Sequence, residues 1–164
     1  MKRRKTGSAG QSLVEFALVL PLLFLIVVNV VNFGAFLFAW ITIANAARTG
    51  SQYMAMGGAT ILAPNHPTAA QVTAVVTNDV SSLLNRSSVQ VKVCTNNNGV
   101  IACTGNGGWA PPADPEPALY VSGSVDVTYT YIPPIPLWSF PNLGIYATLP
   151  PATIHRQAAM RMLQ

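Results

Sequence analysis

The residues from Phe16 to Ile43 form a long apolar run that contains no charged side chain. Its polar side chains are those of Asn29, Asn32 and Thr42. A segment that crosses a lipid bilayer must satisfy its own backbone N–H and C=O groups, so an apolar run of this kind folds as a helix. About 20 apolar residues are enough to span the hydrocarbon core of a bilayer. We therefore expect this run to cross a membrane once, with length to spare.

The helical pattern continues beyond the apolar run. The residues after Ile43 are rich in Ala and Met, which favour helices, and Gly57 with Gly58 is a typical stop signal. Small residues recur four apart, as in Ala46 and Gly50, and this spacing lets another helix approach closely. We therefore divide the chain into three parts: a basic leader at 1–10, a long helix at 11–57 with a transmembrane part, and a small domain at 58–164.

The positive charge of the chain is concentrated at its start. Nine basic and five acidic side chains give a net charge of +4, and four of the basic ones are Lys2, Arg3, Arg4 and Lys5. The remaining five basic side chains balance the five acidic ones, so the composition indicates no nucleic-acid partner. Lys and Arg beside a membrane helix stay on the cytoplasmic side. We therefore expect membrane lipid as a partner and residues 44–164 outside the cytoplasm.

The pattern after the first helix predicts a small domain in which one helix packs on a short antiparallel sheet. A helix is expected at 68–86, with a capping box formed by Thr68 and Gln71 and an apolar face of valines and leucines. Alternating apolar residues predict strands at 88–94 and 124–131, and a weaker alternation, interrupted by Arg156, predicts another at 153–162. The intervening stretches at 96–118 and 132–151 are rich in Asn, Gly or Pro and are interpreted as loops, the second without regular structure. The expected fold class is thus α+β.

Two cysteines and two histidines are the remaining candidates for chemistry. Cys94 and Cys103 lack the close spacing and the further ligands of a thiolate metal site. Outside the cytoplasm a disulfide between them is the natural state, with two free thiols as the alternative. His66 and His155 are each interpreted as an isolated histidine with no nucleophile motif nearby, and the five carboxylates form no pair in the sequence. We therefore expect no enzyme, no metal site and no cofactor.

Glu15 is an acid at the start of the apolar helix. An ionisable side chain in a membrane segment is costly and is a functional candidate by default. No basic residue follows within the next thirty positions, so its partner must be of another kind. A cut after Gly10 would place a new α-amino group on Gln11, one helical turn away. An amine and a carboxylate about 4 Å apart attract by about 4 kcal/mol at an effective dielectric constant of about 20, before desolvation.

Two observations complete the interpretation of this helix. Asn29 lies near four full turns beyond Glu15 and shares its face, and Asn32 lies about a quarter turn away. We therefore group Glu15, Asn29 and Asn32 as candidate assembly residues. The alternative for Glu15 is a solvated carboxylate at the level of the lipid headgroups.

The start of the chain resembles the processing region of type IV pilin-like precursors. The shared features are the basic leader, Gly10, and then Gln11 to Glu15 followed by an apolar helix. In that class a prepilin peptidase cuts after the glycine, and the acid is the fifth mature residue, as Glu15 would be. More narrowly, the chain resembles the TadE-like family in three sequence motifs: VEFALVLP at 14–21, NFG at 32–34 and ANAARTG at 44–50. Members of that family are minor pilins or pseudopilins of the tight-adherence (Tad) pilus and secretion system.

The resemblance covers about residues 7–58 and implies a function. It implies cleavage between Gly10 and Gln11 by a prepilin peptidase, and assembly with other pilin or pseudopilin subunits through the N-terminal helix. The location would be the inner membrane, crossed once, with the C-terminal domain in the periplasm or outside the cell.

Two other interpretations stay open. A signal peptide cut after Ala46 would release a secreted binding protein, although the apolar run far exceeds the 7–15 residues of a signal core. An anchored binding domain would use Trp109, Trp138 and Phe140 as contacts.

Overall fold

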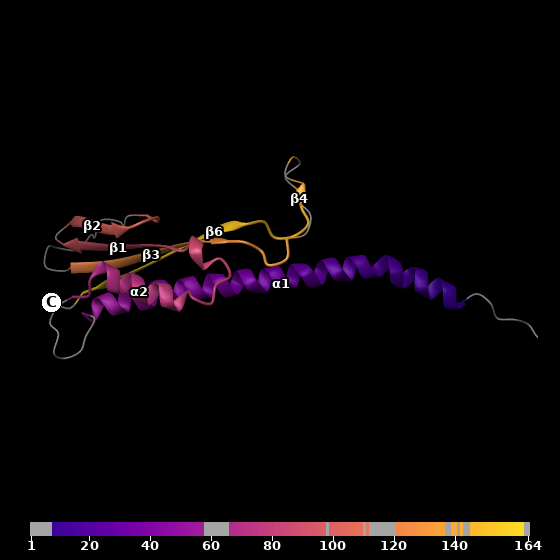
Figure 1. Ribbon diagram of the computed structural model, residues 1–164, viewed down its shortest axis with the longest axis horizontal. Helices are drawn as coiled ribbons and strands as arrows, with labels where there is room; N and C mark the ends of the chain where they lie inside the picture. The colour runs from indigo at the N-terminus through magenta and orange to yellow at the C-terminus, as the bar shows by residue number, and fades with distance from the viewer. Residues whose placement is uncertain are drawn as a thin grey trace, which may run out of the picture. The chain divides into compact units, whose positions relative to one another are not determined.

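The computed structural model describes residues 8–57, 66–97, 99–109, 111, 121–136, 139–140, 142 and 145–162. The chain divides into two compact units, one of residues 1–35 and 133–150 and the other of residues 36–132 and 151–164. Both units contain part of the first helix, α1 (Ser8–Ala55). A second helix and an antiparallel sheet follow, so the expected α+β class is confirmed (Figure 1).

Helix α1 begins at Ser8 and continues through Pro21 to Ala55. It therefore starts before Gly10, and the predicted cleavage point lies within its first turn. Within the part of the chain that the structure describes, Gly10–Ala55 is the one segment long and apolar enough to cross a membrane, and its most apolar 18-residue window has a mean hydropathy of 2.6. Nearly all of the side chains from Leu13 to Val27 are exposed, which suits a surface that faces lipid or another helix.

Helix α2 (Ala69–Asp79) begins with the predicted capping box. The backbone N–H of Gln71 donates to Thr68 Oγ1 at 3.3 Å, and the N–H of Thr68 donates to Gln71 Oε1 at 2.9 Å. The helix ends seven residues earlier than the predicted 68–86. Ser81 and Ser82 follow, and serine competes for backbone hydrogen bonds and favours turns. The short 3₁₀ helix η1 (Arg86–Ser88) comes next.

The main sheet has the strand order β2-β1-β3-β6 and is antiparallel throughout. Its strands are β1 (Gln90–Asn97), β2 (Val100–Gly105), β3 (Val121–Tyr131) and β6 (Ala152–Arg161). The three strands read from the alternating pattern are present. The interpretation of 96–118 as a loop was wrong for β2. Gly99 adopts φ +80° in the turn, which only glycine takes without strain, so the chain reverses and pairs with β1.

The core lies between one face of this sheet and the two helices, the C-terminal part of α1 and α2 (Figure 1). The close approach that the small residues predicted is made by α2 of the same chain. A Cβ on Gly50 would lie 2.7 Å from Val76 Cγ2 and 3.2 Å from Val125 Cγ1. The buried side chains of this core include Ala39, Ile43, Ala46, Ala47, Met54, Val72, Val76, Val80, Val91, Val93, Val125, Val127, Tyr129, Tyr131 and Ile154.

Arg156, which interrupts the apolar face of β6, has a partner on α1. Its guanidinium carbon lies 3.5 Å from the ring centroid of Trp40, a cation–π contact. The ring of Phe36 lies 5.8 Å from Trp40 and meets Tyr131 edge-on at 5.3 Å. Burial raises the pKa of the Tyr131 phenol above its ordinary 10.0, and the neighbouring Tyr129 adds to the rise. This end of the core is therefore aromatic, and the phenol of Tyr131 stays uncharged at neutral pH.

The smaller unit contains a two-stranded antiparallel ladder of β4 (Ser139–Phe140) and β5 (Ile145–Tyr146). The interpretation of 132–151 as wholly irregular was wrong for these four residues. Prolines lack the backbone donor that a ladder needs. Here they lie outside the paired positions, so the ladder keeps its N–H groups.

Candidate assembly site on helix α1

The first turns of α1 place Gln11 and Glu15 side by side. Gln11 Nε2 donates a hydrogen bond to Glu15 Oε1 at 3.1 Å across one helical turn. Both side chains are exposed, and Gly10 is exposed too, with no atom within 4 Å of a Cβ built on it. A group on residue 11 can therefore reach the carboxylate, and a larger side chain at residue 10 would meet no obstacle within the folded chain.

Glu15 stands in a surface that is otherwise apolar. Its neighbours Leu13, Phe16 and Leu18 are exposed, Leu18 by 75%. Soluble monomers rarely expose contiguous apolar patches larger than a few hundred Å². A carboxylate on a surface that faces lipid needs a partner or water, because an isolated charge in hydrocarbon is costly. Within the described residues the carboxylate accepts a hydrogen bond from the uncharged Gln11 amide.

The predicted assembly residues Asn29 and Asn32 bind a distant part of their own chain. Asn29 Nδ2 donates to the carbonyl oxygen of Ala147 at 3.0 Å and also to that of Leu25 at 3.0 Å. Asn32 is fully buried, with 0% of its surface exposed. Its Nδ2 donates to the carbonyl oxygen of Ile135 at 2.8 Å, and its Oδ1 accepts from the N–H of Ile135 at 3.1 Å.

The two asparagines therefore have contacts of a different kind from those of Glu15. The structure joins Asn29 and Asn32 to the segment 133–150, and it does not bring them to Glu15, which lies about 21 Å away along the helix from Asn29. Their partners are more than 100 residues away in sequence. No local pattern indicates such a pairing. An assembly role for the two asparagines stays a prediction.

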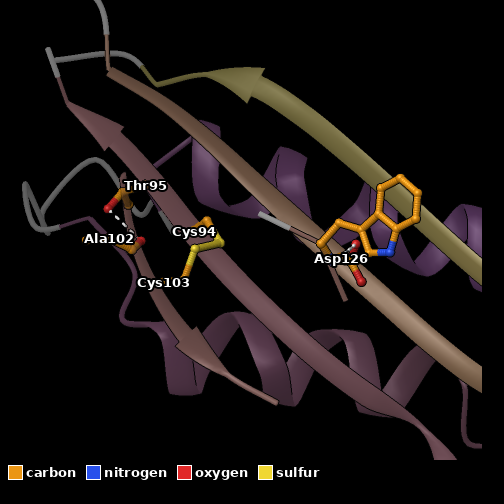
Figure 2. The surroundings of a disulfide bond; sticks show 6 residues. Cys94, Thr95, Ala102, Cys103 and Asp126 are labelled. Carbon is orange, nitrogen blue, oxygen red and sulfur yellow. Dashed lines mark hydrogen bonds between the residues drawn. A yellow bond between two sulfur atoms is a disulfide. The ribbon is translucent and has the colours of Figure 1, made fainter. Parts of the chain in front are cut away.

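Cys94 and Cys103 form a disulfide, as expected. They are directly opposite each other in the register of β1 and β2. Figure 2 shows the bond between these strands, with Asp126 on the adjoining strand β3. Among the described residues no cysteine is free. The bond ties the edge strand β2 to the sheet.

Sequence reasoning missed a polar cluster on the sheet face opposite the helices. Asp126 is only 2% exposed, and its carboxylate is hydrogen-bonded to the ring Nε2 of His155. It also accepts from the backbone N–H of Trp109 and from Thr128 Oγ1, both at 3.4 Å. The Trp109 ring packs on His155 with centroids 5.7 Å apart. This cluster holds the segment that ends at Trp109 against the sheet.

The remaining sequence candidates are placed as follows. His155, interpreted as isolated, has an acidic partner because antiparallel pairing of β3 and β6 puts it opposite Thr128, two residues from Asp126. Trp109 is exposed. Trp138 and the side chain of Phe140 lie outside the described residues. Within the described ranges no group of three or more His, Cys, Asp or Glu side chains is arranged to hold a metal ion.

Helix α1 thus combines an exposed apolar surface with Gly10 and with one acid, Glu15, a turn beyond Gln11. Residues 10–52 match the model of the TadE-like protein family. The match confirms the resemblance seen in the sequence and includes Gly10, Glu15 and both asparagines. It lies wholly within α1, so the sheet and the segment 133–150 fall outside the TadE-like region. A search of curated proteins and a search of solved structures found no match. The TadE-like match suggests a protein associated with a Tad pilus.

Proposed function

We propose that the protein is a minor pilin or pseudopilin of a Tad-type pilus or secretion system and assembles through helix α1. One observation carries the proposal. Within the TadE-like stretch, α1 exposes a long apolar surface that bears a single carboxylate, Glu15, five positions beyond Gly10. An anchor alone requires the apolar surface but gives no reason for the acid or for its distance from the glycine.

In this proposal the peptidase removes residues 1–10 and leaves an α-amino group on Gln11. The new amine belongs to Gln11, the residue one helical turn before Glu15, whose side-chain nitrogen lies 3.1 Å from the Glu15 carboxylate. The acid pairs with this amine or with the amine of a neighbouring subunit. Opposite charges attract strongly where helices exclude water.

The proposed location follows from charge and redox chemistry. Lys2 to Lys5 hold the N-terminus on the cytoplasmic side. The disulfide between Cys94 and Cys103 suits an oxidising compartment on the other side. The protein then crosses the inner membrane once, with residues 58–164 in the periplasm or outside the cell, and its partners are membrane lipid, the prepilin peptidase and other pilin subunits.

Replacement of Glu15 tests the proposed role of this acid in assembly. We expect Glu15→Ala to be cut normally or slightly more slowly and to lose co-isolation with the other pilus subunits. An unpaired amine desolvated at a helix contact costs several kcal/mol, and each 1.4 kcal/mol is about tenfold in association. Glu15→Gln should be intermediate, because it keeps a hydrogen bond without the charge. The measurements are leader removal by mass and subunit co-isolation by affinity purification.

Asp79→Asn is the matched control for this experiment. It removes an exposed carboxylate at the end of α2, outside the TadE-like stretch, and should assemble as the wild type does. If Glu15→Ala is cut and co-isolates as well as Asp79→Asn, then the charge pair has no role in assembly.

A further inference from the structure

The hydrogen bonds of Asn32 imitate those of a backbone residue. The side-chain amide donates to the carbonyl of Ile135 and accepts from its N–H, so both polar groups of one residue in a non-helical segment are satisfied. Asn29 does the same for the carbonyl of Ala147. Ile135 and Ala147, in the segment 133–150, are thereby held at the level of Asn29 and Asn32 on α1.

This attachment limits how deep α1 can lie in a bilayer. A non-helical segment cannot face hydrocarbon, because its backbone polar groups would lack partners there. The level of Asn29 must therefore lie at or beyond the edge of the hydrocarbon core. The stretch from Gln11 to Val28 is about 27 Å long at a rise of about 1.5 Å per residue, close to the core thickness of about 30 Å.

The segment also presents apolar surface at this level. Tyr146 is 49% exposed and Ile135 37% exposed. A groove of about 640 Å³ is lined by Leu25, Ile26, Val30, Phe33 and Gly34 of α1, with Asn29, and by Leu149 of the segment. Leu25 and Ile26 belong to the exposed apolar run, so the groove is continuous with the candidate membrane span. Tyrosine is enriched at membrane–water interfaces because its ring is apolar and its hydroxyl is polar.

We propose that the segment 133–150 is a lipid-binding element at the outer membrane interface. Its described residues contact headgroups through Tyr146 and Ile135, and lipid acyl chains enter the end of the groove that Leu25 and Ile26 line. Asn29 and Asn32 are positioning residues that hold the segment there, and the hydrocarbon crossing of α1 ends near Val28. This inference rests on the membrane insertion that the proposed function requires. Its test distinguishes a failure of the interface proposal from a failure of membrane insertion.

The test is a depth measurement on the full chain in phosphatidylcholine–phosphatidylglycerol vesicles. The native cysteines are joined, so one introduced cysteine can carry an environment-sensitive fluorophore. Labels are placed at Tyr146→Cys, Ile135→Cys and, as the membrane reference, Leu20→Cys. Quenching is compared between lipids with a nitroxide at the headgroup and lipids with a nitroxide deep in the acyl chain.

We expect the Leu20 label to be quenched more by the deep nitroxide and the other two labels more by the headgroup nitroxide. Labels at 135 and 146 that no lipid quenches, while Leu20 is quenched, would overturn the interface proposal and leave the membrane helix intact. That result would point to another subunit as the occupant of the groove. Stronger deep quenching at 146 would also overturn it. A Leu20 label that neither lipid quenches would contradict membrane insertion itself.

A second variant tests the positioning role. In Asn32→Leu the bonds to Ile135 are removed, and we expect the Ile135 label to lose its headgroup quenching while the Leu20 label is unchanged. Thr42→Val is the matched control, because that hydroxyl donates to the carbonyl oxygen of Phe38 in its own helix. Unchanged quenching of the Ile135 label in Asn32→Leu would show that Asn32 does not hold this part of the segment at the interface.

Discussion

Two glycines of α1 show how position decides the effect of the same substitution. Gly50 is packed against α2 and β3, and a Cβ there would lie 2.7 Å from Val76 Cγ2. Gly34 has no atom within 4 Å of such a Cβ. We expect Gly50→Ala to lower the free energy of unfolding by about 1–3 kcal/mol, because the valine side chains must move to accommodate it.

Thermal unfolding of the detergent-solubilised full chain, followed by near-ultraviolet circular dichroism, measures this difference. Gly34→Ala is the control and should melt at the wild-type temperature or above it. Equal melting of the two variants would contradict the tight contact of α1 with α2.

Single residues also mark the limit of what the sequence predicts. The capping box of Thr68 and Gln71 and the acid at Glu15 were recognisable because each is a local pattern. The bonds of Asn32 to Ile135 and of His155 to Asp126 were not, since they depend on which distant segments the fold brings together. His155 was interpreted as isolated for that reason.

At the scale of elements, α1 has two kinds of surface along its length. Its first part exposes large apolar side chains, and its last part buries small ones such as Ala46 and Gly50 against the sheet. The sequence indicated the change to Ala and Met after Ile43 and the close approach of a helix, but not the burial of these residues against the sheet. Strand β2 was missed because it is short, is flanked by Asn and Gly, and is mostly exposed, so no alternation of buried side chains marks it.

The disulfide compensates for the few buried side chains of β2. We expect Cys94→Ala with Cys103→Ala to lower the free energy of opening β2, the edge strand that the bond ties to β1, by up to about 3 kcal/mol. The loss should be local, because β2 lies at the edge of the sheet and bonds only to β1. Hydrogen exchange should become faster for the amides of β2 and stay slow in the pairing of β3 with β6.

The same exchange measurement on the unchanged protein before and after reduction serves as the control, since reduction breaks the same bond without a substitution. Equal acceleration across all four strands would contradict a local role for the bond.

At the scale of the whole molecule, the chain contains a TadE-like helix followed by a disulfide-bonded sheet. The α+β class, the long helix and three strands of the sheet followed from periodicity and composition. The position of Ile135 and Ala147 could not be predicted from periodicity or composition, because it depends on hydrogen bonds from two asparagines of α1. The prolines of the segment 133–150 indicated only where a ladder could not form.

The mature N-terminus tests the central claim most directly. The protein is isolated from cells that produce the complete Tad system, and the mass of its N-terminal peptide is measured. Cleavage by a prepilin peptidase gives a chain that begins at Gln11. Gly10→Val should leave the leader attached, because a side chain at that position crowds the scissile bond, although it meets no atom of the folded chain within 4 Å of its Cβ. Gly34→Val, a change of the same kind beyond the cleavage region, should still begin at Gln11. A wild-type chain that begins at Met1, as a plain anchor would, or at Ala47, as a secreted protein would, contradicts the proposal.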